Sequence, residues 1–284
     1  MKKVLVFGSR GMAGHVITLY LSKFKDKYDI TNVCNKQSLN DDSILCDIID
    51  IRKVTKLIEL NNPDVIINCV GILNKDEYND IQNMTYVNTF FPRFLARFGE
   101  THNIKIIHLS TDCVFDGKLG NYTEKSFKSE NGIYGLSKNL GEIDSKNCIT
   151  IRTSIIGPEL KDGSGLFNWF MKQSNNINGF SNVYWTGITT LELAKVVDKL
   201  IDEDINGIYN IVPNYKISKY ELLNIIKDVF NKTNINIIKN SDVKSDKSLV
   251  SSKLKFSVST YEHMVIEMRD WILENKSIYS RYLI

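Results

Sequence analysis

The sequence predicts an α/β fold built on a doubly wound parallel sheet, with a smaller α/β region in its C-terminal half. Short apolar runs rich in β-branched residues alternate with runs of helical periodicity through the first half of the chain. The apolar runs are nearly continuous, as in strands that are buried on both faces of a parallel sheet. This alternation of strand and helix is typical of sheets covered by helices on both sides.

Six apolar runs are predicted as strands, at residues 3–7, 29–34, 43–46, 64–70, 104–110 and 148–152. The helices expected between them start at Met12 and span about 51–60, 77–100 and 133–145, with Asp50 able to cap the second. Pro92 lies inside the long helical region. We expect a break or kink there, because proline has no amide hydrogen and clashes with the preceding turn.

In the second half of the chain, strand-like and helical runs alternate less regularly. Strand-like runs at 207–212 and 235–239 lie among three Ser/Thr-x-x-Glu patterns that resemble capping boxes, which begin at Thr189, Ser218 and Ser259. We predict one domain over residues 1–155 and a second region over 156–284, of which about 183–212 returns to the first domain.

Composition excludes several classes of protein. The 284 residues are 43% hydrophobic and 24% charged, and the net charge of +3 gives no indication of nucleic-acid binding. No apolar run is long enough to span a membrane, and the N-terminal one is too short for a signal peptide. The five cysteines form no C-x-x-C pair and lie mostly in apolar runs. We therefore expect buried free thiols and a cytoplasmic location. No metal site is predicted.

A glycine pattern, FGSRGMAGH, joins the first strand to the first helix. Its glycines are Gly8, Gly11 and Gly14, and Ser9, Arg10 and Met12 lie among them. In this context the pattern predicts a Rossmann-type dinucleotide site: the glycines allow a tight turn, approach of a pyrophosphate and close packing of the helix. Residues 1–155 would then be the dinucleotide-binding domain and residues 156–284 mainly the substrate-binding region.

The end of the second strand suggests which dinucleotide binds. It reads Cys34-Asn35-Lys36, without the acidic residue that holds the ribose of NAD. Lys36 and Arg10 could instead meet a 2′-phosphate, which arginine contacts in a bidentate manner. NADPH is therefore favoured, with NADH as the alternative.

Candidate catalytic residues follow the fifth strand in HLSTDCVFDG, residues 108–117. Ser110 and Thr111 are hydroxyls that could bond a substrate carbonyl or cap the loop. Tyr134 and Lys138, in IYGLSKNLGE, lie four residues apart on one face of the next helix. Lys138 would lower the pKa of the Tyr134 phenol. Tyr134 could then exchange a proton with an alcohol or ketone oxygen that Thr111 orients. His108 is interpreted as a core residue.

These motifs together resemble the extended short-chain dehydrogenase/reductase superfamily. Within it, the segments STDCVFDG, YGLSKNLGE and RTSIIGP are most similar to the dTDP-4-dehydrorhamnose reductase family, and the resemblance covers nearly the whole chain. It implies NADPH-dependent reduction of the C4 ketone of a nucleotide-linked 4-keto-6-deoxyhexose, for surface polysaccharide such as O-antigen or capsule. A nucleotide sugar is the implied partner, and a homodimer is compatible with the family.

The resemblance also assigns positions. Asp47 and Ile48 would contact adenine, Cys69, Val70 and Gly71 would line the cofactor site after the fourth strand, and Asn88 would support the site. Ser110 is assigned to the cofactor. The substrate would meet Asp112, Cys113, Ile155, Trp169 and Trp185, although both tryptophans could equally be core residues. Arg152 or the lysines within 245–256 could bind its diphosphate.

Cys113 and Ile155 stand where the family often has an aromatic residue and a tryptophan. The sugar could therefore be dTDP-4-dehydrorhamnose or a UDP-linked 2-acetamido-4-keto-6-deoxy sugar. Cys113 also occupies the position of the acid that 4,6-dehydratases need, which argues against that activity.

Two alternatives remain open. An epimerase-reductase of the GDP-fucose synthase type has a cysteine two residues after its catalytic hydroxyl, as Cys113 follows Thr111. However, its histidine is absent from residues 155–190. The second alternative is a non-catalytic NADP-binding regulatory subunit, similar to the methionine adenosyltransferase β subunit.

Overall fold

A computed structural model describes residues 1–73 and 81–282. Its contacts divide the chain into two units. The first unit comprises Met1–Val114, Lys128–Arg152 and Ala194–Tyr209, and the second unit comprises Phe115–Phe127, Thr153–Leu193 and Asn210–Ile284. The assignment of one part to the cofactor and the other to the substrate stays a prediction.

The first unit is built on a sheet whose strand order is β10-β6-β5-β4-β1-β2-β3. Its strands are β1 (Lys2–Phe7), β2 (Tyr28–Cys34), β3 (Ile44–Leu45), β4 (Val65–Asn68), β5 (Lys105–Leu109), β6 (Cys148–Arg152) and β10 (Gly207–Asn210). The pairs from β6 to β3 are parallel. The chain runs outward from β1 in both directions, so the order reverses between β1 and β4. The predicted doubly wound parallel sheet is confirmed, and all six predicted strands are present.

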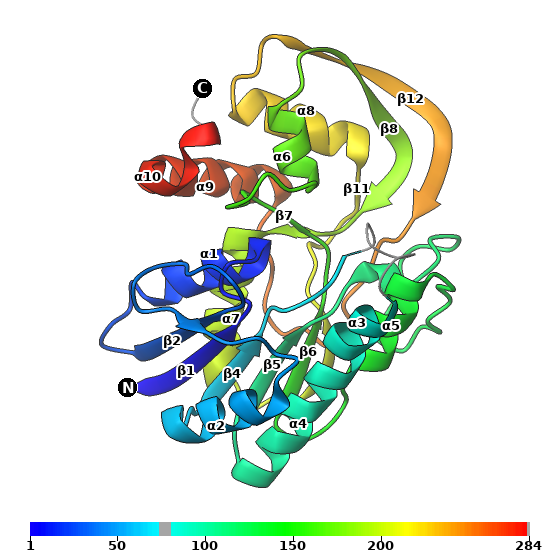
Figure 1. The fold of residues 1–284 in the computed structure, drawn as a ribbon. Coiled ribbons are helices and arrows are strands. Elements are labelled where there is room, and N and C mark those ends of the chain that lie inside the picture. The colour runs from blue at the N-terminus through cyan, green and yellow to red at the C-terminus, as the bar shows by residue number, and fades with distance from the viewer. Residues whose placement is uncertain (74–80, 283–284) are drawn as a thin grey trace. The chain divides into compact units, whose positions relative to one another are not determined.

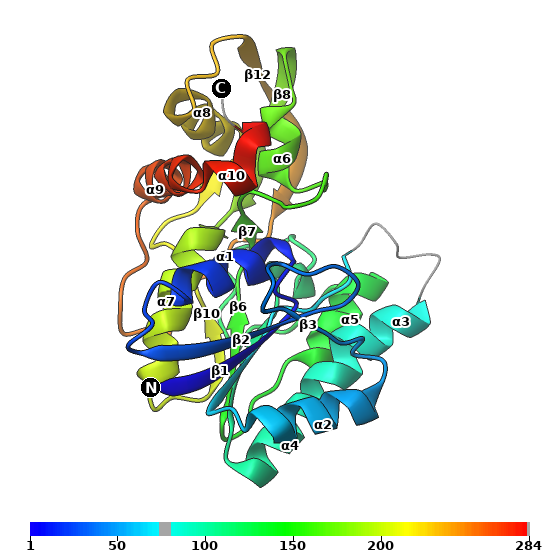
Figure 2. The same cartoon turned by 60° about the vertical axis from the view of Figure 1, so that its left-hand side comes forward.

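Helices cover both faces of this sheet (Figures 1 and 2). α1 (Met12–Leu21) and α7 (Thr190–Asp202) lie on one face. The other face carries α2 (Ile51–Asn61), α4 (Phe91–His102) and α5 (Ile133–Gly141). The short elements α3 (Ile81–Thr85) and η3 (Asp112–Val114) also belong to this unit. Each helix crosses back over the sheet, which is the connection that parallel strands require.

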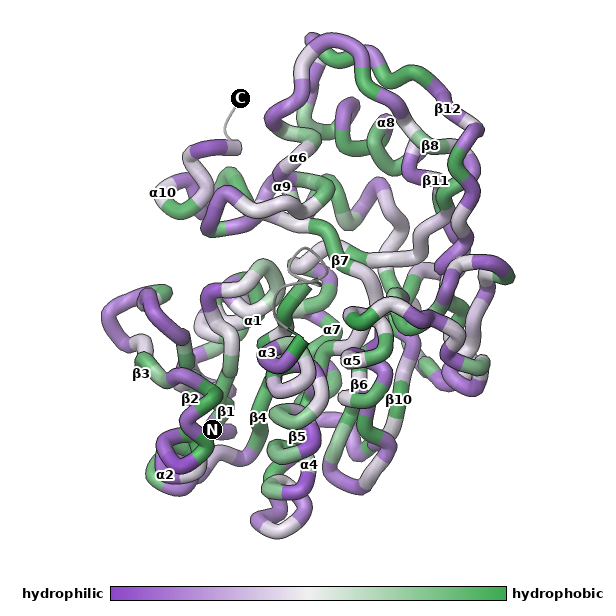
Figure 3. The backbone as a smooth tube through the Cα atoms, turned by 45° about the vertical axis from the view of Figure 1, so that its right-hand side comes forward, coloured by the Kyte–Doolittle hydropathy of each residue, from purple (hydrophilic) through white to green (hydrophobic). Residues whose placement is uncertain are grey.

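The core lies between the sheet and the layer of α2 and α4. Leu5, Ile66 and Ile106 of the strands pack there against helical residues such as Ile58 and Leu95, all of them fully or almost fully buried. The hydropathy colouring shows the same contrast, with green strands β1 and β4 and mainly purple connecting loops (Figure 3). Burial of continuous apolar strands therefore stabilises this layer.

The long helical region contains the break that Pro92 predicts. A π-helical turn, η2 (Tyr86–Phe90), separates α3 from α4, and Pro92 lies in the first turn of α4. The backbone stays helical through Phe90 and Phe91, where the Phe91 amide bonds the Tyr86 carbonyl, so Pro92 directly follows a π-type bond. Residues 77–80 of the predicted helix lie outside the described residues.

Two predicted helix caps are present. The Asp50 side chain accepts from the Lys53 amide at the start of α2, and Ser218 and Glu221 form a complete capping box at the start of α8 (Lys219–Val229).

The predicted capping box at Ser259 is wrong by one residue. Thr260 caps α9 (Tyr261–Glu274) and accepts from the His263 amide. The Ser259 amide instead donates to Glu192 at 3.0 Å. For the same reason the box at Thr189 is only half formed: Thr189 accepts from the Glu192 amide, while the Glu192 carboxylate bonds elsewhere.

The second unit contains a smaller mixed sheet in the order β11-β8-β12. Its strands are β8 (Asn175–Trp185), β11 (Ile217–Ser218) and β12 (Ile235–Asp246), and β7 (Ile155–Ile156) pairs separately with β9 (Ile188–Thr189). Its other helices are α6 (Leu166–Met171), α10 (Lys276–Tyr279) and η4 (Ser280–Tyr282). β8 and β12 run parallel with an irregularity between Asn240 and Lys244.

The described parts of the chain contain no helix that could serve as a membrane span. Cys34, Cys46 and Cys148 are buried free thiols, whereas Cys69 and Cys113 are partly accessible.

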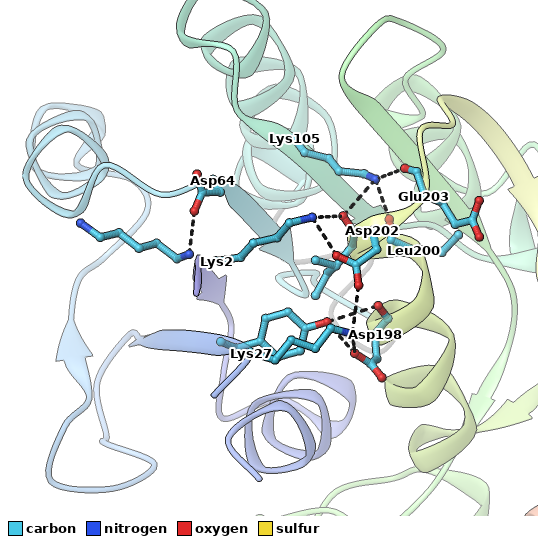
Figure 4. A network of polar contacts seen from close by, with 11 residues as sticks. Lys2, Lys27, Asp64, Lys105, Asp198, Leu200, Asp202 and Glu203 are labelled. Atoms are coloured by element: carbon cyan, nitrogen blue, oxygen red, sulfur yellow. Dashed lines mark hydrogen bonds and ion pairs between the residues drawn. The ribbon is translucent and has the colours of Figure 1, made fainter. Parts of the chain in front are cut away.

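A polar network at the amino ends of the strands holds the end of α7 (Figure 4). The Lys105 ammonium, on β5, donates to the carbonyl oxygens of Leu200 (2.6 Å) and Glu203. Lys2 and Lys27 pair with Asp202 at 2.8 and 3.0 Å. Lysines that bond the last carbonyls of a helix complement its negative end.

We expect Lys105→Met to lower the free energy of unfolding by about 1–2 kcal/mol, because it leaves partly buried carbonyl oxygens without a charged donor. Urea unfolding followed by circular dichroism measures the change. Lys2→Met is the matched control, since its exposed ion pair should contribute less than about 1 kcal/mol. Equal losses in both variants would contradict this role of Lys105.

Candidate active site

The turn after β1 is built around the three predicted glycines. Gly8 has a φ angle of +79°, which glycine adopts without strain. Gly11 is the N-cap of α1, and a Cβ atom at Gly14 would lie 2.1 Å from the Gly8 carbonyl oxygen. The absence of a side chain at Gly14 therefore allows α1 to pack directly against the turn.

The start of α1 is available to an anion. The buried Ser9 hydroxyl donates to the Val6 carbonyl (2.7 Å) and accepts from the Val33 amide (3.1 Å), so it fixes the turn to β1 and β2. Helix α1 has no side-chain cap and no acidic residue in its first turn, which starts at Met12. Its free amides and positive dipole end suit a pyrophosphate.

A cavity of about 420 Å³ lies in the first unit, where the strand order reverses. Several residues predicted to bind the cofactor line it: Gly8, Lys36, Asp47, Ile48, Val70 and Gly71. The adjacent Cys69 donates its amide hydrogen to the Phe7 carbonyl at 3.0 Å. Open α/β sheets bind ligands at this position, and apolar walls with a few polar groups suit an adenosine.

Two cations accompany this cavity. Lys36 lines it and is exposed. Arg10 donates from Nη1 to the Ser38 carbonyl at 2.6 Å, while its buried Nε has no partner among the described residues. A buried donor without an acceptor is costly, so this arginine retains capacity for an anionic ligand. The residues present thus fit an NADP-type dinucleotide.

Helix α5 carries Tyr134 and Lys138 and lies in direct contact with neighbouring backbone. A Cβ atom at Gly141 would lie 1.9 Å from the Asn88 carbonyl oxygen, and one at Gly135 would lie 2.4 Å from that of Cys113. The helix ends at Gly141, before the predicted end at about residue 145. These two contacts therefore fix the position of α5 along its axis and its rotation about that axis.

Asn88 supports the same helix from the π-turn. Its side chain is fully buried and donates to the Ser137 hydroxyl at 3.1 Å. The Asn88 amide oxygen accepts from the Ile72 amide at 3.0 Å. This side chain therefore joins α5 to the segment that follows β4.

Tyr134 and Thr111 are brought together. Their side chains are hydrogen-bonded, and Thr111 also donates to the Asp112 carboxylate at 3.1 Å and accepts from the Cys113 amide at 3.1 Å. Burial raises the pKa of Tyr134, with smaller contributions from Cys113 and Asp112. The expectation that Lys138 would lower this pKa is therefore wrong for this structure. The phenol keeps its proton at neutral pH.

Lys138 lies one turn of α5 after Tyr134, toward the C-terminal end of the helix. Its ammonium donates to the Leu109 carbonyl, at the end of β5, at 2.7 Å. Burial lowers the pKa of Lys138 to about 8, opposed by the charge of Glu142 and by Cys69. A Cβ atom at Gly71 would lie 3.9 Å from the Lys138 nitrogen. The lysine is therefore next to the lining of the cofactor cavity.

His108 is a core residue, as predicted. Its fully buried ring is hydrogen-bonded to Asn68 at 3.1 Å. Burial, reinforced by the charge of Lys138, places its pKa well below the usual range. A ring with so low an affinity for a proton is a poor general base for the reaction.

Sequence reasoning missed Glu142 and Lys128. Glu142 accepts from Ser110 (2.8 Å), from Arg152 through two bonds (2.8 and 2.7 Å) and from Lys128 (2.8 Å). Arg152 is therefore buried in an ion pair, and its suggested role at the substrate diphosphate is wrong. A charged residue at the end of the apolar run CITIR was the available signal.

The three substrate candidates of the second unit differ in accessibility. Trp169, on α6, is 39% exposed. Trp185 is 3% exposed, and its ring packs 5.9 Å from that of Tyr261 and under the Lys219 ammonium at 4.8 Å. Ile155 is half-buried in β7. Trp185 thus has the surroundings of a core residue, and the substrate role of all three stays a prediction.

The doubly wound sheet, the glycine turn and the Thr111–Tyr134–Lys138 arrangement define an extended short-chain dehydrogenase/reductase. The chain belongs to the family described as RmlD substrate binding domain, whose model matches residues 1–282.

Individual relatives agree with this family. A dTDP-4-dehydrorhamnose reductase of Aggregatibacter actinomycetemcomitans is 30% identical over 160 residues, which are 54% of this chain and 51% of that protein. The chain thus matches about half the length of this relative. The β subunit of methionine adenosyltransferase 2 from Xenopus laevis is 24% identical over 245 residues, 81% of this chain and 72% of that protein.

Solved structures share the fold. The crystal structure of dTDP-4-dehydrorhamnose reductase from Bacillus anthracis, a complex with NADP, superposes with a TM-score of 0.81 at 21% identity. The match covers 95% of this chain and 99% of that chain.

Gly11 and Gly14 should respond differently to substitution by alanine. Gly14→Ala places a methyl group 2.1 Å from the Gly8 oxygen and should lower the melting temperature strongly. At Gly11 the corresponding distance is 3.2 Å, so Gly11→Ala should fold normally. It should nevertheless weaken NADPH binding by about tenfold or more, because the methyl group occupies the path of the pyrophosphate. Thermal denaturation and titration of NADPH fluorescence separate the two effects; normal binding by Gly11→Ala would exclude the turn as the pyrophosphate site.

Proposed function

We propose that the protein is an NADPH-dependent reductase of the C4 ketone of a nucleotide-linked 4-keto-6-deoxyhexose. The observation that carries the proposal is the contact of the Tyr134 and Thr111 hydroxyls with Lys138 nearby, in the unit that also contains the glycine turn. The names of the reductase relatives support the same substrate class. The sugar is dTDP-4-dehydrorhamnose or a UDP-linked 2-acetamido analogue.

The residues of this chain supply the proton and its orientation. Bound NADPH would supply the hydride. Tyr134, protonated at neutral pH, would donate its proton to the oxygen at C4 as negative charge develops there. Thr111 would orient that oxygen and stabilise the charge. The Lys138 ammonium, which bonds the carbonyl at the end of β5, could reach the ribose of the cofactor.

A homodimer that acts in the cytoplasm, in the synthesis of surface polysaccharide, is part of the proposal. The family and the reductase relatives support the class of reaction in this proposal.

A regulatory subunit is the second candidate, because the methionine adenosyltransferase β subunit aligns with more of this chain than the reductase relative does, 81% against 54%. Loss of NADPH absorbance in the presence of each 4-keto sugar distinguishes the two. If NADPH binds and no 4-keto sugar oxidises it, the reductase proposal fails and the subunit is favoured.

Tyr134→Phe should reduce kcat by about 10²–10⁴-fold, because it removes the proton donor and little else. NADPH affinity should change by less than about twofold, as measured by fluorescence titration. Tyr215→Phe, at a tyrosine that is 48% exposed, is the control for removal of a hydroxyl. Residual kcat above about a hundredth of the native value would rule out Tyr134 as the general acid.

Lys36→Ala should weaken NADPH binding by about tenfold and leave NADH binding nearly unchanged, because the lysine meets a phosphate that only NADPH carries. Titration with both cofactors gives the ratio, and Lys146→Ala, at an exposed lysine, is the control. An equal loss for both cofactors would contradict the assignment of Lys36 to the 2′-phosphate.

A further inference from the structure

A layer of polar side chains is buried between α5 and the carboxyl ends of β5 and β6. The side chains of Glu142 and Arg152 have no exposed surface, and Lys128 is 26% exposed. The apolar cluster lies on the same face of the sheet, around Ile106 and Cys148. The change from apolar to polar therefore occurs within single strands, on the side where Lys138 lies.

The Glu142 carboxylate is satisfied on both oxygens. Oε1 accepts from Arg152 Nε (2.8 Å) and from the Ser110 hydroxyl (2.8 Å). Oε2 accepts from Arg152 Nη2 (2.7 Å) and from Lys128 (2.8 Å). A fully bonded buried carboxylate of this kind is rigid. Buried ion pairs add little net stability compared with apolar packing, so stability alone is a weak reason for this cluster.

The same carboxylate is connected to two parts of the candidate catalytic group. Ser110 directly precedes Thr111, so its bond to Glu142 fixes the backbone that carries the Thr111 hydroxyl. Lys138 lies four residues before Glu142, the extended residue that ends α5, and the charge of Glu142 acts on its ammonium. Its ammonium donates to Leu109, the residue before Ser110. Lys138 and Glu142 thus hold adjacent residues at the end of β5.

We propose that Glu142 is a positioning residue for the reduction, held by Arg152 and Lys128, which fixes the end of β5 to the end of α5 and supplies the negative charge that acts on the Lys138 ammonium. This inference rests on the proposed reductase function for its kinetic part only.

The groups that face Lys138 come from three elements. Glu142 at the C-terminal end of α5 and Cys69 after β4 raise its pKa against the lowering by burial, which leaves it at about 8. The Cys69 thiol is itself neutral, because burial raises its pKa to about 12. His108 on β5 is neutral at physiological pH. Among these neighbours Glu142 carries the negative charge, and Arg152 and Lys128 moderate it.

Two substitutions should move the pH dependence in opposite directions. The kcat of the native enzyme should fall as the pH rises through the pKa of Lys138, because the ammonium form is needed. Glu142→Gln removes the negative charge and should shift this alkaline limb to lower pH by about one unit. Lys128→Met leaves Glu142 with one cation fewer and should shift the limb to higher pH. KM for the sugar should change by less than about twofold in both.

The pH profile of kcat with the 4-keto sugar measures these shifts. Lys146→Met makes the same chemical change at an exposed lysine and should leave the profile in place. A merely structural role would lower the melting temperature of both variants without opposite shifts. Shifts of the same sign, or no shift, would overturn the proposal.

A direct titration of Lys138 keeps the test independent of the sugar. In ¹³C-lysine-labelled protein without substrate, the Lys138 side-chain signal is assigned by its loss in Lys138→Arg. Its midpoint should fall in Glu142→Gln and rise in Lys128→Met. If no sugar is reduced but these midpoints move as expected, the reductase proposal fails and the electrostatic role of Glu142 stands. If Glu142→Gln does not fold, an unchanged midpoint in the partly exposed Lys128→Met is sufficient to overturn it.

Discussion

The close contact of α5 with neighbouring backbone is the constraint on which the candidate active site depends. Gly135 and Gly141 leave no room for a side chain against Cys113 and Asn88. A helix packed this closely cannot slide or rotate without a steric clash, because protein interiors contain few voids. Tyr134 lies next to the first contact and Lys138 between the two. The geometry of the proton donor is therefore determined by residues that take no part in the chemistry.

On the side of α5 the sheet carries an apolar layer and a polar layer, and the two have different roles. Toward the amino ends, residues such as Ile66 and Ile106 are buried among apolar helices and stabilise the fold. Two residues further along the same strands, Asn68 and His108 bond each other. This polar layer stabilises less for each buried group, but its hydrogen bonds have fixed directions and hold side chains in one arrangement.

Much of this organisation could be predicted from sequence because its signals are local. Continuous apolar runs identified the strands, and a turn with glycines at fixed spacing identified the start of α1. The partnership of Glu142 with Arg152 could not, since it depends on how α5 packs on β6. The raised pKa of Tyr134 depends on burial, which the Tyr-x-x-x-Lys spacing does not reveal. At the start of α9 the sequence favoured Ser259, because a glutamate follows it by three residues, and the chain geometry selects Thr260 instead.

The π-helical turn at Tyr86–Phe90 has a consequence for sequence comparison. Such a turn accommodates one residue more than an α-helix of the same course. A relative that lacks the turn will align with this chain only if a gap of one position is placed inside these five residues. A gap placed further along α4 would transfer the role of Asn88 to a neighbour that points away from Ser137. Annotation of the supporting asparagine across relatives therefore requires the backbone geometry of this turn as well as residue identity.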